Sequence, residues 1–247
     1  MSKVPQITLA FWVLKILATT LGETGGDLVS MTLGLGYVAA TGLFFAVFLA
    51  LASGQVLARR FHPFLYWGVV LATTTVGTTI SDFLDRTAGL GYLGGALVLA
   101  GALIAVLVAW RLTLGAIASD HISDRRHESF YWLTILVSNT LGTALGDFLA
   151  DDSGLGYGGG ALLIGALIAA VAGAHRFTRL PKTLLFWVAF VLTRPLGATV
   201  GDLLTKPHAK GGLDLGTIPA SALIALAVVA GVAVVYRGGR GAAGASA

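Results

Sequence analysis

Four copies of one motif run through the chain, and each copy places an aspartate inside a long apolar segment. The copies are TTLGETGGD at 19–27, TTVGTTISD at 74–82, NTLGTALGD at 139–147 and RPLGATVGD at 194–202. In every copy a tryptophan lies ten residues before the motif glycine, and the aspartate lies five residues after that glycine. This regularity restricts the fold to one structural unit repeated four times.

The segment that follows each aspartate is also repeated. Three copies continue seven residues later with Gly-Leu-Gly-Tyr, which begins at Gly34, Gly89 and Gly154. The fourth copy departs from this pattern and has Gly-Leu-Asp-Leu-Gly from Gly212. The four copies are therefore not expected to be strictly equivalent.

Each copy contains two apolar stretches long enough to cross a membrane. Hydrophobic residues make up 56% of the chain and charged residues 11%, whereas soluble domains have about 25% charged residues. We predict eight transmembrane helices, at about 8–32, 36–57, 64–85, 91–111, 129–150, 157–175, 183–205 and 216–236. The expected fold is an all-α integral membrane protein of four parallel two-helix repeats with internal pseudosymmetry.

The basic residues predict the orientation in the membrane. Most of them lie in the termini or in the loops after even-numbered helices, whereas the opposite loops carry only Arg86, Lys206 and Lys210. The positive-inside rule therefore predicts that both termini are cytoplasmic. Because the basic charge is explained by topology, we expect no nucleic-acid partner. The chain has no cysteine, which excludes disulfides and thiolate metal sites.

We expect one transmembrane domain over 1–236, with repeats at about 8–57, 64–111, 129–176 and 183–236. The charged segment 119–128 is interpreted as a solvated loop and 237–247 as a flexible cytoplasmic tail. The motif tryptophans are interpreted as an interfacial aromatic belt, which would place the aspartates in the outer third of the bilayer. The even-numbered helices are rich in small residues and are expected to serve packing.

Polar residues precede the first three aspartates at helical spacing, four, seven and eight positions earlier, whereas the fourth copy has Ala198, Pro195 and Arg194 at these positions. These positions share one helix face, so each odd-numbered helix carries a narrow polar stripe. The stripes hold Glu23 and a set of residues that would line a path: Thr20, Thr75, Thr78, Asn139, Thr140 and Thr143. Lys15 and Arg194 are expected to pair with Glu23 or an aspartate, and Pro195 to break or kink its helix.

Two interpretations of the stripes remain open. In one, the carboxylates are packing contacts that hold the helices together by hydrogen bonds. In the other, they form an ion or proton pathway. With Lys15 and Arg194 as the only basic partners, five ionised carboxylates would leave three excess negative charges. Such a cluster needs protons or bound cations inside a membrane, which favours a transport site.

The candidate metal ligands are the motif aspartates and one glutamate: Asp27, Asp82, Asp147, Asp202 and Glu23. Carboxylate, hydroxyl and amide oxygens suit hard cations such as Mn²⁺, Mg²⁺, Ca²⁺ or Na⁺. No histidine falls on the stripes, and neither a nucleophile–base pair nor a nucleotide-binding motif is present. We therefore expect no enzymatic activity, and no cofactor other than a bound divalent cation.

The repeated unit of tryptophan, glycine, aspartate and Gly-Leu-Gly-Tyr resembles a bacterial family of membrane proteins built from two-helix repeats of unknown function. The resemblance covers about residues 8–236. It implies a place in the bacterial inner membrane and a link with metal-ion export, manganese in particular.

The leading hypothesis is a gradient-driven cation transporter that exports a divalent metal such as manganese in exchange for protons. The alternative is a structural or sensory membrane protein whose polar stripes are packing contacts. The expected partners are the lipid bilayer, the metal cation and protons. The sequence leaves open the identity of the ion, the direction of transport and the oligomeric state, a homo-oligomer included.

Overall fold

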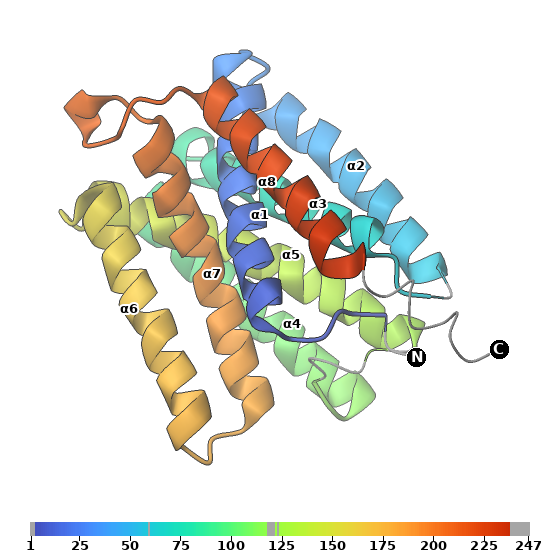
Figure 1. Ribbon diagram of the computed structural model, residues 1–247. Helices are drawn as coiled ribbons and strands as arrows, with labels where there is room; N and C mark the ends of the chain where they lie inside the picture. Colours follow the sequence, from blue (N-terminus) through green and yellow to red (C-terminus); the bar gives the residue numbers. More distant parts are fainter. Residues whose placement is uncertain (1–2, 59, 118–121, 123, 238–247) are drawn as a thin grey trace.

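The computed structural model is a bundle of helices (Figure 1). It describes residues 3–58, 60–117, 122 and 124–237, and within these ranges the chain forms eight α-helices and no β-strand. The helices are α1 (Leu9–Asp27), α2 (Tyr37–Leu57), α3 (Pro63–Asp82), α4 (Gly91–Leu114), α5 (Arg125–Asp147), α6 (Gly156–Phe177), α7 (Lys182–Thr205) and α8 (Thr217–Arg237). These bounds follow the predicted spans closely.

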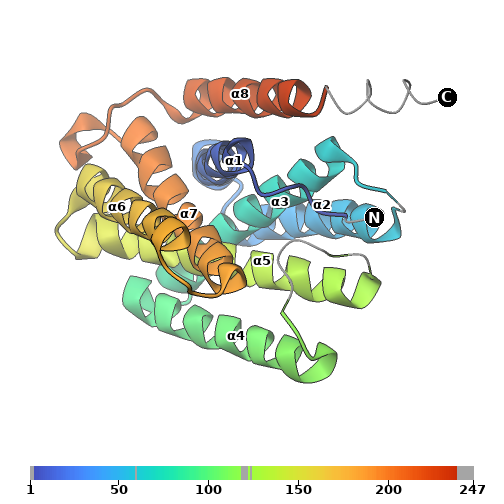
Figure 2. The same ribbon diagram turned by 60° about the horizontal axis from the view of Figure 1, so that its bottom comes forward.

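Seven helices in the described part of the chain are long and apolar enough to cross a membrane, which indicates a membrane protein. The remaining helix, α1, carries Lys15, Glu23 and Asp27 within its 19 residues. It packs against α3, α7 and α8 (Figure 2), and these three charged residues are buried. The polar residues of α1 therefore face protein, as expected for ionisable groups at membrane depth.

The first helices of the four repeats form a closed inner ring. α1 packs against α3, α3 against α5, α5 against α7, and α7 against α1. The second helix of each repeat packs outside the ring, on the first helix of the following repeat: α2 on α3, α4 on α5, α6 on α7 and α8 on α1. The order is cyclic, so the parallel repeats close into one body.

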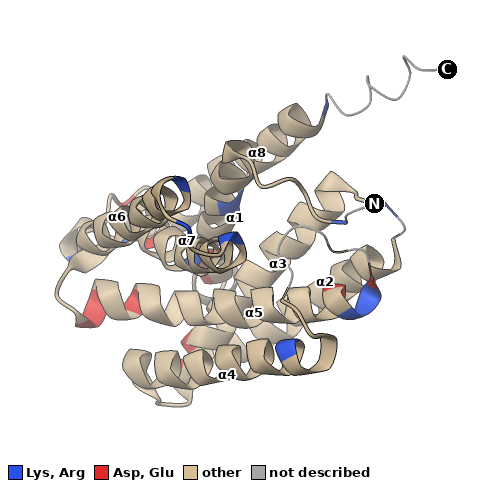
Figure 3. Cartoon of the chain, turned by 90° about the horizontal axis from the view of Figure 1, so that it is seen from below, with Lys and Arg blue, Asp and Glu red and all other residues tan. Residues whose placement is uncertain are grey.

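The outer helices present apolar surface. α4 and α8 each carry one charged residue in the last turn, Arg111 and Arg237 respectively. Figure 3 shows these helices in tan, the colour of residues without charge, along most of their length. Exposed leucine and valine side chains dominate both helices. This surface suits contact with lipid. The even-numbered helices also pack on the inner helices, as the sequence predicts.

The motif glycines allow close approach within the inner ring. Gly22 lies against Thr74 of the next repeat, and a methyl group added to Gly22 would overlap that side chain. The contact recurs around the ring, with Gly77 against Thr140, Gly142 against Arg194 and Gly197 against Thr19. Small residues at helix crossings are common in membrane proteins, because lipid provides no hydrophobic driving force for helix association.

The motif tryptophans face protein, and their predicted depth at the membrane interface stays a prediction. Trp67, Trp132 and Trp187 are buried, and each motif tryptophan follows another aromatic residue. The aromatic residue of one repeat contacts the tryptophan of the next, with ring centroids 5.6 Å apart for Phe11–Trp67, 5.3 Å for Tyr66–Trp132, 5.8 Å for Tyr131–Trp187 and 5.7 Å for Phe186–Trp12. Packing between aromatic rings therefore joins neighbouring repeats at this end of the inner helices. We call these eight residues the aromatic ring.

The charged linker is shorter than the sequence predicts. α5 begins at Arg125. Its N-cap residue is Asp124, whose side chain accepts hydrogen bonds from the backbone N–H groups of Arg126 and His127. Glu128 is buried and pairs with Lys3 at 2.8 Å, so this part of the predicted solvated loop is packed against the N-terminal segment. Residues 118–121 and 123 of the linker, and the predicted tail after Arg237, lie outside the described residues.

The fourth copy retains the turn that Gly-Leu-Gly-Tyr makes in the other copies. Gly34 and Gly36 have φ angles of 70° and 75°, and Asp214 and Gly216 have φ angles of 54° and 77°. Residues 214–217 of the fourth copy therefore correspond to Gly-Leu-Gly-Tyr of the other copies. This segment begins two residues after Gly212, where the sequence pattern alone would place it. Aspartate tolerates the left-handed conformation better than most residues, which allows it to replace a glycine there.

Candidate cation site

The motif aspartates lie where the helix geometry changes. α1, α3 and α5 end at Asp27, Asp82 and Asp147, and each continues into a five-residue π-helical segment: η1 (Leu28–Thr32), η2 (Phe83–Thr87) and η3 (Phe148–Asp152). α7 passes Asp202 without such a segment and ends at Thr205. Single π-helical turns are rare and often mark functional sites.

The inner helices bring the five predicted metal ligands into one buried cluster. Glu23 and the four motif aspartates each expose at most 4% of their surface. Asp147 interacts electrostatically with Glu23, Asp82 and Asp27, and Asp202 interacts with Glu23, Asp27 and Asp147. We call these five residues the carboxylate cluster.

Arg194 is the basic partner of Glu23. Its Nη2 atom donates to Glu23 Oε2 at 2.8 Å and to Thr78 Oγ1 at 2.5 Å, and its side chain has no exposed area. Nη1 donates to the backbone carbonyl of Thr19 at 3.5 Å. Arg194 therefore joins α7 to both α1 and α3.

Lys15 takes a different position from the one predicted. Its Nζ atom donates to Asn139 Oδ1 at 3.1 Å and lies 4.1 Å from the centre of the Phe190 ring. Asn139 in turn donates to Thr73 Oγ1 at 2.9 Å. Among the described residues no carboxylate pairs with Lys15, so the expected pairing with Glu23 or an aspartate is wrong. Twelve residues separate Lys15 from Asp27 on one helix, about 18 Å, and this distance places the amine away from the carboxylates.

Two further basic residues, Lys206 and Arg86, reach the cluster, although the sequence predicts both in loops. Lys206 Nζ lies 2.6 Å from Asp27 Oδ2 and 3.1 Å from Asp202 Oδ1. Arg86 lies 3.3 Å from Asp82 Oδ1 through Nε and 3.8 Å from Asp147 Oδ2 through Nη2. Each follows a motif aspartate by four residues, a spacing that puts the two side chains on one helix face. This spacing was the available signal.

Burial lowers the pKa of Lys206, but the carboxylates of Asp202 and Asp27 raise it by more, so the pKa lies above the usual value for lysine. Lys206 is therefore an ammonium ion at neutral pH. It sits at the end of α7, where 19% of its side chain is exposed.

The two bridging residues correct the charge count. Five carboxylates share the inner bundle with Lys15, Arg194, Arg86 and Lys206, so full ionisation leaves one excess negative charge and not three. The sequence predicts an excess of three because Arg86 and Lys206 lie in the loops between the predicted helices. Each bridges the aspartate of its own repeat and that of the next, which divides the aspartates into the pairs 82/147 and 202/27.

Three of the carboxylates are arranged as a set of metal ligands would be. Glu23, Asp147 and Asp202 each offer an oxygen, and these oxygens lie within 4.8 Å of one another. Ca²⁺ and Mg²⁺ bind oxygen at about 2.0–2.6 Å, so one ion placed among the three oxygens would be within reach of all. Asp147 Oδ2 is buried and accepts no hydrogen bond in the described structure, and its basic neighbour Arg86 Nη2 lies 3.8 Å away. This oxygen therefore has free capacity to bind a cation.

Two of the predicted path-lining residues form hydrogen bonds between helices. Thr78 donates to the carbonyl of Gly22 at 3.1 Å, and Asn139 bonds to Lys15 and Thr73 as described above. Thr143 donates to the carbonyl of Asn139 in its own helix at 3.3 Å. The hydroxyls of Thr20, Thr75 and Thr140 donate to carbonyls four residues earlier in their own helices. All of these residues are buried.

Pro195 does not break its helix. α7 is continuous from Lys182 to Thr205. The carbonyl of Pro195 accepts from Thr199 Oγ1 at 2.9 Å, and Gly142 of α5 faces the ring of the proline. Of the predicted break or kink, the break is therefore absent, since neighbouring groups can accommodate proline within a membrane helix.

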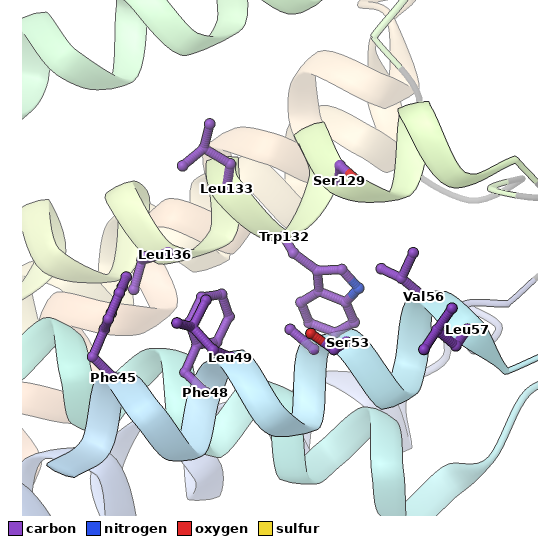
Figure 4. Close-up of a pocket in the computed structure, with 11 residues that line it drawn as sticks. Phe45, Phe48, Leu49, Ser53, Val56, Leu57, Ser129, Trp132, Leu133 and Leu136 are labelled. Carbon is purple, nitrogen blue, oxygen red and sulfur yellow. The ribbon is translucent and has the colours of Figure 1, made fainter. Parts of the chain in front are cut away.

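A groove of about 540 Å³ lies between α2 and α5 and is lined by apolar residues such as Phe48 and Leu136 (Figure 4). Trp132 forms part of its wall. Trp132 lies fifteen residues before Asp147 on one helix, about 22 Å away. The groove is therefore separate from the carboxylate cluster.

Comparison with known proteins agrees with this architecture of four repeats. No curated protein and no solved structure matches the chain. The family described as "Repeat of Unknown Function (DUF347)" matches at residues 10–61, 65–116, 130–180 and 185–240. Each match contains one inner helix, one motif aspartate and one outer helix. The chain therefore belongs to this family of four tandem repeats.

Proposed function

We propose that the protein is a gradient-driven cation transporter of a bacterial inner membrane, which exchanges a hard divalent cation such as Mn²⁺ for protons. All eight helices would span the bilayer, with both termini in the cytoplasm. The observation that carries the proposal is the set of buried oxygens from Glu23, Asp147 and Asp202, which converge from three inner helices.

Carboxylates inside a membrane suit this exchange. A buried carboxylate is costly as an isolated anion, so it is stable either when protonated or beside a cation. Arrival of a divalent cation would favour release of protons from the cluster, and return of protons would favour release of the cation. The same oxygens would then serve both substrates in turn.

The two ends of the inner bundle differ in a way that suits a transporter. The aromatic ring fills the end where the inner helices begin, and Tyr66 and Tyr131 share a hydrogen bond of 2.7 Å there. At the other end Lys206 and Arg86 are partly exposed, at 19% and 31% of their side chains. The carboxylate cluster would therefore open first toward the end that carries these two basic residues.

A structural or sensory role remains the second candidate, and one observation favours it. Arg194, Arg86 and Lys206 neutralise most of the cluster, and threonine hydroxyls donate to carbonyls of neighbouring helices. Such contacts hold membrane helices together in many proteins. Only the transport function requires an ion to cross the membrane, so a flux measurement distinguishes the two candidates.

The test is Mn²⁺ flux into proteoliposomes that contain a pH-sensitive dye. We compare the wild type with Asp147→Asn, which keeps the shape of the side chain, and with Asp152→Asn, which alters an exposed residue five positions later. We expect Asp147→Asn to reduce flux about tenfold or more, which corresponds to about 1.4 kcal/mol of lost binding, while Asp152→Asn leaves flux unchanged. If Mn²⁺, Mg²⁺, Ca²⁺ and Na⁺ are all inert with the wild type, transport is refuted and the structural role stands.

A further inference from the structure

Lys206 occupies a position inside the carboxylate cluster that a substrate cation would compete for. Its ammonium group lies between Asp27 Oδ2 at 2.6 Å and Asp202 Oδ1 at 3.1 Å. Asp202 is also one of the three residues whose oxygens converge. A cation bound to Asp202 and its neighbours would therefore meet the ammonium group directly.

The other bridging residue has more partners, although its ion pairs are longer than those of Lys206, at 3.3 Å to Asp82 and 3.8 Å to Asp147. Arg86 Nη1 donates to Tyr37 Oη at 3.1 Å, and its guanidinium lies 5.8 Å from the centre of the Tyr92 ring. Lys206 has only the two carboxylates as side-chain partners in the described structure. A lysine ammonium is a compact charge on a flexible stem, whereas an arginine fork is fixed by several contacts at once. Lys206 is thus the bridging residue whose side chain has fewer contacts to break when it moves out of the cluster.

Its location permits that movement. Lys206 is the residue directly after α7, and its side chain is 19% exposed. The backbone is fixed, because its N–H donates to the carbonyl of Asp202 and its carbonyl accepts from Asp214 N–H at 3.0 Å. Release would therefore need only rotation of the side chain toward solvent, with α7 left in place.

We propose that Lys206 is a tethered cation that occupies the site between Asp27 and Asp202 in the absence of substrate and is displaced when the substrate cation binds. This inference rests on the proposed transport function. With Lys206 withdrawn, the five carboxylates keep only Arg194 and Arg86 as basic partners, because Lys15 pairs with Asn139. The cluster then carries an excess of negative charge, which attracts a divalent cation more strongly than a monovalent one.

The test is a titration of Mn²⁺ into the full-length protein in detergent micelles, followed by isothermal calorimetry. Lys206→Met removes the competitor and is expected to tighten Mn²⁺ binding about tenfold. Lys206→Arg keeps the charge, but the guanidinium can donate hydrogen bonds to both carboxylates at once. This variant is therefore expected to bind Mn²⁺ more weakly. Lys210→Met removes the same charge from an exposed position in the same loop, and binding is expected to match that of the wild type.

The order of affinity, Lys206→Met above wild type above Lys206→Arg, is the supporting result. Should Lys206→Met fail to fold, weakened binding in Lys206→Arg supports the proposal and unchanged binding overturns it. Equal affinities across the series, in a protein that carries Mn²⁺ in proteoliposomes, overturn the tethered cation and leave transport standing. Absence of both binding and flux in every variant overturns both.

Discussion

At the scale of single residues, the inner bundle is governed by how each buried charge is matched. Glu23 is matched by Arg194, and the paired aspartates are bridged by Lys206 and Arg86. Lys15 is the exception, with an amide oxygen and an aromatic ring as its neighbours. Burial makes each match necessary, because a charge left without a partner in a low-dielectric interior is strongly destabilising.

Arg194→Met is therefore expected to lower the free energy of unfolding by about 3 kcal/mol, since it leaves the buried carboxyl group of Glu23 without its basic partner. The double variant Arg194→Met/Glu23→Gln removes both charges and should recover more than half of the loss. Chemical unfolding in detergent measures both values. A double variant no more stable than Arg194→Met would show that lost packing, and not the unpaired carboxylate, is responsible.

At the scale of helices, the crossings of the inner ring depend on the motif glycines. Gly197 of α7 faces Thr19 of α1, and an added methyl group would overlap both the side chain and the backbone of that threonine. The backbone cannot give way as a flexible side chain can. The glycine is therefore required by the approach of two helices, and not by its own conformation.

Gly197→Ala is expected to destabilise the protein by about 1–3 kcal/mol, the usual cost of overpacking, despite the better helix propensity of alanine. The matched control is Gly165→Ala in α6, where nothing lies within 4 Å of the added methyl group. That change should leave stability equal or slightly higher. Thermal unfolding in detergent compares the two, and equal effects would contradict the close crossing.

At the scale of the molecule, the four repeats close into a ring because α8 returns to α1. Thr32, at the end of η1, and Thr217, at the start of α8, lie at this contact. Their Oγ1 atoms are 3.3 Å apart although 185 residues separate them in the chain. Cyclic closure also explains why each outer helix packs on the next repeat and not on its own. No repeat could bury its polar residues alone.

A cross-link tests this closure, because the chain has no native cysteine. The double variant Thr32→Cys/Thr217→Cys is expected to form an intramolecular disulfide on mild oxidation, since the side chains already lie within bonding reach. The control Thr32→Cys/Thr113→Cys places the second thiol on α4, which is not a neighbour of α1. Mass spectrometry of proteolytic fragments identifies the bond. Equal cross-linking in the control would contradict the ring.

The sequence by itself determined the number of repeats, the helix bounds and the burial of the motif aspartates. It could do so because hydrophobic length and a repeated spacing are local properties of the chain. The aromatic dipeptides and the basic residues four positions after Asp82 and Asp202 were visible as patterns, but their partners were not. Those partners lie on other helices, so only the tertiary structure decided them.

The tertiary structure therefore decided which charges meet. It placed Lys206 between Asp27 and Asp202, which lie 175 residues apart in the chain, and it gave Lys15 an amide in place of a carboxylate. The physical reason is that an electrostatic interaction depends on distance in space, which the cyclic packing of α1, α3, α5 and α7 sets. Periodicity identifies the polar face of a helix, but helix packing selects what that face meets.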